Sequence, residues 1–111
     1  MDRLRTGMGL VGLGAKARRL AIGVDAAREA LRRGLAEGLV LAEDAGPRAR
    51  ERLVPLAANR GVTVLRGPTA EELGRVLGRP PVHGVAVLDR QLARGLRAYL
   101  EAEDRGEKVG L

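Results

Sequence analysis

The segment Ile22–Asp44, IGVDAAREALRRGLAEGLVLAED, contains most of a strand–helix–strand unit. The short apolar run Leu20–Ile22 predicts a strand, and Gly23 follows it as a tight turn. Asp25 is a suitable N-cap for the helix that follows, and Gly38–Ala42 predicts the next strand. The helix has alanine and leucine at helical spacing, which predicts a buried stripe of four residues: Ala27, Ala30, Leu31 and Leu35.

The middle of the chain is harder to assign because it holds two prolines. Pro47 is suited to begin a helix, but Pro55 would then lie in the helix interior, where proline costs about 3 kcal/mol. We therefore predict a turn or loose helical segment over residues 47–53. A firm helix should begin near Pro55 and end at Asn59–Gly61, and Val62–Leu65 predicts the third strand.

Two well-marked helices follow in the C-terminal half. Thr69–Glu72 has the pattern of a capping box, and Gly78 followed by two prolines ends that helix. His83–Leu88 predicts the fourth strand, and Asp89 should cap the last helix. The apolar face of this last helix is predicted to consist of Leu92, Leu96, Tyr99 and Leu100.

Together these elements predict the fold class. Residues 7–17 predict one more helix, weakened by glycine. Short apolar strands that alternate with helices indicate a sheet covered on both faces. We predict a single α/β domain over residues 1–100, a three-layer α/β/α sandwich with a mixed sheet of about four strands. Residues 101–111 should form a charged tail that frays.

The residue types that the chain lacks exclude several kinds of chemistry. It has no cysteine, serine, tryptophan or phenylalanine, and one histidine, His83. Serine and cysteine nucleophiles and thiolate metal sites are therefore excluded, and we predict no catalytic residue, no metal and no cofactor. Rows of aromatic side chains for stacking unpaired bases are absent too. No apolar run approaches the roughly 18 residues of a membrane span, so we expect a cytoplasmic protein with no membrane partner.

The net charge of +6 is unevenly distributed along the chain. Residues 1–36 hold eight basic and three acidic side chains, a net of +5, whereas residues 37–111 hold twelve and eleven, a net of +1. Such an asymmetric field is typical of a phosphate-binding face, although an ordinary solvated surface remains the alternative. The basic residues that surround the predicted helix start are Arg18, Arg19, Arg28, Arg32 and Arg33.

Three short motifs have simpler interpretations than the functions they imitate. Gly7–Gly12 satisfies the G-x-G-x-x-G pattern, but only six residues precede it, so no strand leads into it as a dinucleotide site requires. Glu43–Asp44 follows a strand, and we interpret it as a turn with local hydrogen bonds rather than a metal site. We interpret His83 as a strand-entry or surface residue.

Two longer stretches resemble a known family. Leu10–Asp44 and Val64–Asp89 are similar to the L-seven-Ae/L-thirty-e family of kink-turn RNA-binding ribosomal proteins, and to its small bacterial members of the YlxQ type. The similarity covers about residues 7–100, and Leu39–Asp44 and Glu72–Gly78 carry it most specifically. The resemblance implies an α/β/α sandwich that binds structured RNA through one edge. It also implies a role in translation, with ribosomal RNA and a ribosomal or translation-factor protein as candidate partners.

The resemblance also implies two RNA-contact regions. The family's Gly-x-Asn-Glu-x-x-Lys motif, which contacts the tandem G·A pairs of a kink-turn, reads Gly23, Asp25, Ala26 and Glu29 at its four defined positions. The glycine is kept and three recognition side chains are replaced. Arg28 lies about 100° around the helix from the lysine position. The second region is the loop before the last strand, with Arg79, Val82 and His83.

The predicted RNA-binding residues are therefore Arg18, Arg19, Gly23, Asp25, Arg28, Arg32, Arg33, Arg79, Val82 and His83. The alternative is a protein-interaction module on the same fold that has lost kink-turn recognition.

Overall fold

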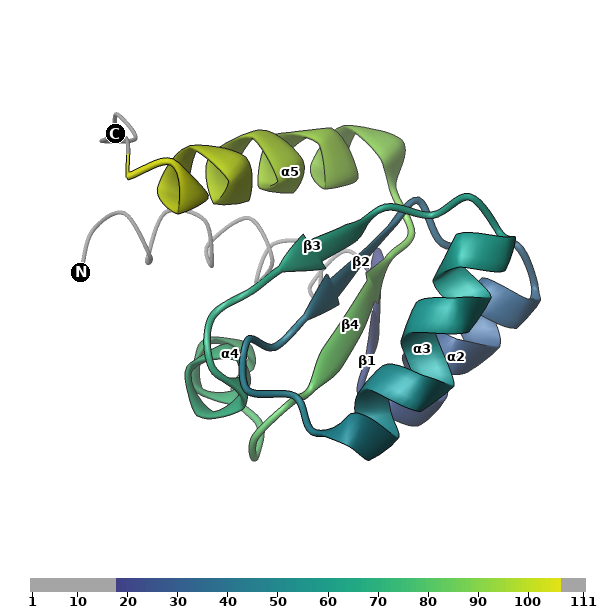
Figure 1. Cartoon of the computed structure of the whole chain (residues 1–111), viewed down its shortest axis with the longest axis horizontal. Helices are drawn as coiled ribbons and strands as arrows, with labels where there is room; N and C mark the ends of the chain where they lie inside the picture. The colour runs from purple at the N-terminus through teal and green to yellow at the C-terminus, as the bar shows by residue number, and fades with distance from the viewer. Residues whose placement is uncertain (1–17, 107–111) are drawn as a thin grey trace.

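The computed structural model describes residues 18–106, which form four strands and four helices (Figure 1). The strands are β1 (Leu20–Ile22), β2 (Gly38–Leu41), β3 (Val64–Arg66) and β4 (Gly84–Val87). The helices are α2 (Val24–Arg32), α3 (Pro47–Asn59), α4 (Ala70–Leu77) and α5 (Arg90–Asp104). The predicted helix over residues 7–17 and the Gly7–Gly12 motif lie outside the described residues.

The strands form one mixed sheet in the order β1-β4-β2-β3. β4 is antiparallel to both of its neighbours, with Leu20 opposite Val87 and Leu39 opposite Ala86. β3 is parallel to β2, with Leu39 opposite Val64. β1, β2 and β3 therefore run in the same direction, and β4 runs against them.

Helices cover both faces of this sheet, which confirms the predicted three-layer sandwich (Figure 1). On one face, Val40 belongs to a core that includes Leu96 of α5. On the other face, Leu39 belongs to a core with Leu31 of α2 and Leu53 of α3. Consecutive residues of β2 thus enter opposite cores, because side chains alternate along a strand. This explains why the strand is apolar throughout.

The start of α2 differs from the prediction. Gly23, not Asp25, is the N-cap, and no side chain caps this helix. Gly23 has φ 102° and ψ 160°, a conformation that favours glycine, and its carbonyl accepts the N–H of Ala27. Asp25 is the second residue of the helix and lies in its first turn. Leu35 is 48% exposed because the chain has left the helix at Arg32 and no longer follows the buried stripe.

The prediction for α3 was wrong, because the region is one continuous helix. Pro47 occupies its first turn, Gly46 is the N-cap, and Pro55 lies inside the helix. Leu53 and Ala57, on either side of Pro55, are completely buried. Burying a leucine side chain contributes about 1.5–3 kcal/mol, which is comparable to the cost of an interior proline. Tertiary packing therefore keeps the helix intact across Pro55, which is itself exposed.

The remaining boundaries follow the predicted capping signals. The Thr69 hydroxyl accepts the N–H of Glu72 at 3.2 Å, and the Asp89 carboxylate accepts the N–H of Leu92 at 2.8 Å. Gly78 ends α4 in the left-handed region, at φ 68°. The third and fourth strands are shorter than predicted. α5 stays helical through Asp104, past the point where we expected fraying, and no helix within residues 18–106 is long and apolar enough to cross a membrane.

The interior proline of α3 gives a stability prediction. Replacing Pro55 with alanine should raise the free energy of unfolding by about 1–3 kcal/mol, because alanine restores the N–H donor to the Glu51 carbonyl and removes the ring clash. Urea unfolding followed by circular dichroism measures this change. The exposed neighbour Glu51→Ala is the control and should stay within about 0.5 kcal/mol of the parent. A Pro55→Ala variant less stable than the parent would contradict the helical assignment.

Candidate nucleic-acid interface

Three helices begin at one edge of the sheet. Because β1, β2 and β3 are parallel, their carboxyl ends lie together, and each is followed by a helix. The N-caps of α2, α3 and α4 are Gly23, Gly46 and Thr69, and we call this side of the molecule the helix-start edge. Helix N-termini attract anions through their unpaired N–H groups and their dipoles. In open α/β sheets this is also the side where ligands bind.

The start of α4 is capped by the protein itself. The Asp44 carboxylate accepts the N–H of Ala70 at 2.8 Å, and Thr69 caps the same turn. The turn predicted at Glu43–Asp44 is confirmed, because the N–H of Ala45 donates to the Ala42 carbonyl at 3.0 Å. The Asp44 side chain, however, accepts its hydrogen bond from across the fold and not from within the turn. Its neighbour Glu43 pairs with Arg66 at 3.8 Å. Within the described part of the chain no cluster of side chains is suited to hold a metal ion.

The starts of α2 and α3 are different, because neither has a side-chain cap. A pocket of about 290 Å³ lies at this place. Its lining residues are Val24, Gly46, Arg48, Ala49, Arg52 and His83. A second groove continues from it between α2 and α3, lined by Arg28, Glu51, Arg52, Pro55, Leu56 and Asn59. Arg52 borders both hollows and so connects them.

Arg52 also changes the charge at the start of α2. Its guanidinium lies 2.6 Å from a carboxylate oxygen of Asp25, whose side chain is 87% exposed. The pair offsets the negative charge that Asp25 places where the family has asparagine. Arg28 and Arg48 are exposed, and neither forms an ion pair with another residue in the range 18–106. The surface around the two uncapped helix starts is therefore basic.

Several of the predicted RNA-binding residues lie at this edge. Gly23 donates its N–H to the carbonyl of Gly84 at 2.9 Å, and the His83 carbonyl accepts the N–H of Ala42 at 2.9 Å. The first bond holds the start of β4 against the start of α2, and the second joins the loop before β4 to the end of β2. Asp25, Arg28 and His83 are exposed there, as the prediction requires. The sequence and the fold thus bring the two predicted contact regions together.

Arg79 and Val82 lie on the loop between α4 and β4 but differ in exposure. Arg79 is exposed, and its N–H caps the end of α4 by donating to Gly74. Val82 is only 6% exposed, packs in the core with Leu73, and donates its N–H to Ala70. The buried side chain of Val82 anchors the loop and is not available to a partner. We therefore remove Val82 from the predicted contact residues.

The other predicted arginines lie at the opposite edge. The carbonyl of Arg19 accepts the N–H of Leu88, and its side chain lies 3.6 Å from Asp89. α2 runs back from Gly23 to this same edge, where it ends at Arg32 and Arg33. These residues, with the exposed Arg18, therefore do not share a face with the helix starts. The clustering of basic residues in the sequence predicted a single basic surface, whereas the fold distributes these residues between two edges.

Arg48 and Arg52 were missed by the sequence analysis. The cause was the assignment of residues 47–53 as a turn or loose segment, which gave these arginines no defined direction. A signal was present, because Pro47 after Gly46 is typical of a helix start. From that start, Arg48 and Arg52 are four residues apart and lie on one helical face.

The fold and this edge define a small α/β/α protein with a basic surface at two uncapped helix starts. The chain belongs to the Ribosomal protein L7Ae/L30e/S12e/Gadd45 family, whose sequence profile matches residues 6–108. This is a family of kink-turn RNA-binding proteins that are generally not enzymes.

Solved structures have the same fold. A protein of unknown function from Bacillus halodurans C superposes with a TM-score of 0.80 at 26% identity, over 86% of this chain and 96% of the other. The Giardia lamblia 15.5kD RNA binding protein superposes with a TM-score of 0.73 at 23% identity, over 89% and 88% of the two chains. A comparison with curated proteins found no match.

The exposure of the Asp25–Arg52 pair gives a prediction. Asp25→Ala and Arg52→Ala should each change the free energy of unfolding by less than about 1 kcal/mol, because exposed ion pairs contribute little. Leu53→Ala, the next residue of α3, should lower it by about 2–5 kcal/mol because its side chain is fully buried. Urea unfolding of the three variants checks both. A large loss from either polar variant would give the pair a structural role.

Proposed function

We propose that the protein binds structured, kink-turn-like RNA through the helix-start edge, as a cytoplasmic, YlxQ-type member of its family acting in translation. The observation that carries this proposal is the pair of uncapped helix starts between Arg28, Arg48 and Arg52. Ribosomal RNA and a ribosomal or translation-factor protein are the candidate partners.

The contacts divide by chemistry. The free N–H groups at the starts of α2 and α3 suit phosphate oxygens, and so do the guanidinium groups beside them. On the neighbouring loop, Arg79 and His83 are placed to contact a second strand that folds against the first. A sharply bent RNA presents two backbones close together, which matches two basic regions joined by the Gly23–Gly84 hydrogen bond.

The departures from the family motif assign a particular role to α3. The family's lysine position is Glu29, which lies 3.6 Å from Arg32 and so does not offer a cation to RNA. Arg52 instead reaches the start of α2 from the neighbouring helix and lies against Asp25. In our proposal, Arg52 replaces the lost lysine from a different element, and Arg28 supports it from the groove that both border.

A protein-interaction role is the second candidate, and one observation favours it. Asp25, Ala26 and Glu29 replace three side chains that the resemblance assigns to kink-turn recognition. A member that no longer reads G·A pairs would keep the fold for another partner. Capture of a protein that survives nuclease treatment and high salt would support this second function.

The test is binding of the purified protein to a standard kink-turn duplex and to a duplex whose G·A pairs are replaced, each at two salt concentrations. We expect tighter binding to the intact kink-turn, with affinity falling as salt rises. Equal, salt-sensitive binding to both duplexes would contradict kink-turn recognition. It would indicate a protein that contacts RNA phosphates without recognising the G·A pairs. Absence of binding to either would contradict the RNA function and favour the protein partner.

Two matched triple variants localise the interface. Replacing Arg28, Arg48 and Arg52 with alanine should weaken RNA binding and reduce the salt slope by up to about 0.9 for each lost phosphate contact. Replacing Arg19, Arg32 and Arg33 with alanine removes the same charge from the opposite edge and should have the smaller effect. Circular dichroism confirms that both variants fold. A larger loss of RNA affinity in the second variant would contradict this account, because it would place the interface at the opposite edge.

A further inference from the structure

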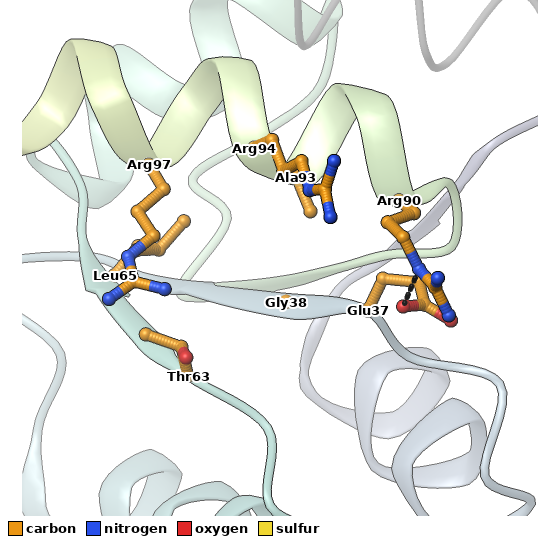
Figure 2. A pocket seen from close by; sticks show the side chains of 8 residues that line it. All are labelled: Glu37, Gly38, Thr63, Leu65, Arg90, Ala93, Arg94 and Arg97. Atoms are coloured by element: carbon orange, nitrogen blue, oxygen red, sulfur yellow. Dashed lines mark ion pairs between the residues drawn. The ribbon is translucent and has the colours of Figure 1, made fainter.

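Another basic groove, which we call the α5 groove, lies away from the helix-start edge, between α5 and the sheet (Figure 2). Its volume is about 180 Å³. The lining residues are Glu37, Gly38, Thr63, Leu65, Arg90, Ala93, Arg94 and Arg97. Three arginines of α5 thus stand over one face of β2 and β3, and the RNA proposal uses none of them.

The three arginines differ in how their charges are balanced. Arg90 lies 3.5 Å from Glu37, and Arg97 lies 3.2 Å from Glu101 one turn along the helix. The side chain of Arg94 has no hydrogen bond or ion pair with any residue between 18 and 106. In Figure 2, the Arg97 side chain extends from α5 towards the segment that carries Leu65 and Thr63, whereas the Arg94 guanidinium lies beside α5 near Ala93. The groove therefore offers at least one cation that the described chain leaves unpaired.

The groove borders an open strand edge. Among residues 18–106, β3 is the last strand of the sheet and pairs only with β2. The N–H of Leu39 donates to the Thr63 carbonyl, and the N–H of Gly67 donates to the Leu41 carbonyl. In a parallel ladder this directs alternate residues 63, 65 and 67 towards β2. The backbone groups of Val64 and Arg66 consequently face outward, and Val64 is 38% exposed.

We propose that this groove and the outer edge of β3 bind an extended acidic segment of a protein partner, which adds a strand to the sheet. Addition of a strand pairs the outward groups of Val64 and Arg66. Alternate side chains of the added strand point to the α5 side, where carboxylates meet Arg94 and Arg97.

The open edge decides between a peptide and a nucleic acid. RNA phosphates would use the arginines but would leave the N–H and C=O groups of Val64 and Arg66 unpaired. A peptide strand pairs with the backbone groups of β3 and, through its carboxylates, with the arginines. The apolar floor formed by Leu65 and Ala93 suits the side chains of a β-strand. The site is independent of RNA binding at the helix-start edge, so the two proposals can fail separately.

The test uses the full chain and a labelled peptide of alternating glutamate and threonine, with a lysine–threonine peptide as the charge control. Fluorescence anisotropy should show binding of the acidic peptide alone. Hydrogen exchange measured by NMR should show the amide protons of Val64 and Arg66 becoming protected when the peptide is added. Protection confined to other amides would overturn strand addition.

Three variants complete the experiment. Arg94→Glu combined with Arg97→Glu should weaken peptide binding by about tenfold or more, a loss of two charge-assisted contacts. Val64→Pro removes an outward N–H without removing a bond to β2, and should weaken binding as well. Arg75→Glu, the same substitution at a single arginine of α4, is the control and should bind like the parent. Kink-turn RNA binding should be unchanged in all of them.

Either of two results would overturn the proposal. One is acidic-peptide binding that the Arg94/Arg97 double variant leaves unchanged. The other is displacement of the acidic peptide by oligouridylate that requires Arg94 and Arg97 but is unchanged by Val64→Pro. In that case the Val64 amide would also remain unprotected. The latter would assign the groove to RNA phosphates instead of a peptide.

Discussion

The common direction of β1, β2 and β3 is the constraint on which the candidate interface depends. Because β4 is inserted antiparallel between β1 and β2, the three parallel strands end together and their helices begin together. The fold thereby gathers helix N-termini at one edge, and α4 alone of these helices has a side-chain cap. The hydrogen bond from Gly23 to Gly84 then fixes the loop before β4 beside them. The topology thus gathers helix N–H groups that suit anions at this edge before any arginine is considered.

The charged side chains refine what the topology provides. Asp25 would repel phosphate from the start of α2, but Arg52 of α3 lies against it, so the local charge depends on two helices together. The same principle operates at the opposite face, where Arg90 and Arg97 have acidic neighbours and Arg94 has none within the described chain. In both proposals, the cations that the described chain leaves without an ion pair, rather than the total charge, mark the surface that we expect to bind.

Much of the fold was predictable from local signals. Thr69, Gly78 and Asp89 mark helix ends through their own hydrogen-bonding and backbone preferences, and these assignments are confirmed. The continuity of α3 was not predictable in this way, because the burial of Leu53 outweighs the local preference of Pro55. The site was predictable in part. Gly23 and His83, which the resemblance implied, lie at the helix-start edge, but chain order could not show that α2 carries Arg32 and Arg33 to the opposite edge. Nor could it show the contact from Arg52 to Asp25, which joins residues of two helices.

The central claim is that RNA contacts the edge where α2 and α3 begin. The most direct measurement is NMR chemical-shift mapping of the isotope-labelled protein during titration with a kink-turn duplex. The account predicts that the largest amide shifts fall at Gly23, Gly46, Arg48 and His83, with small shifts at Arg19 and Leu88. Large shifts at Arg19 and Leu88, with Gly23, Gly46 and Arg48 unaffected, would contradict it.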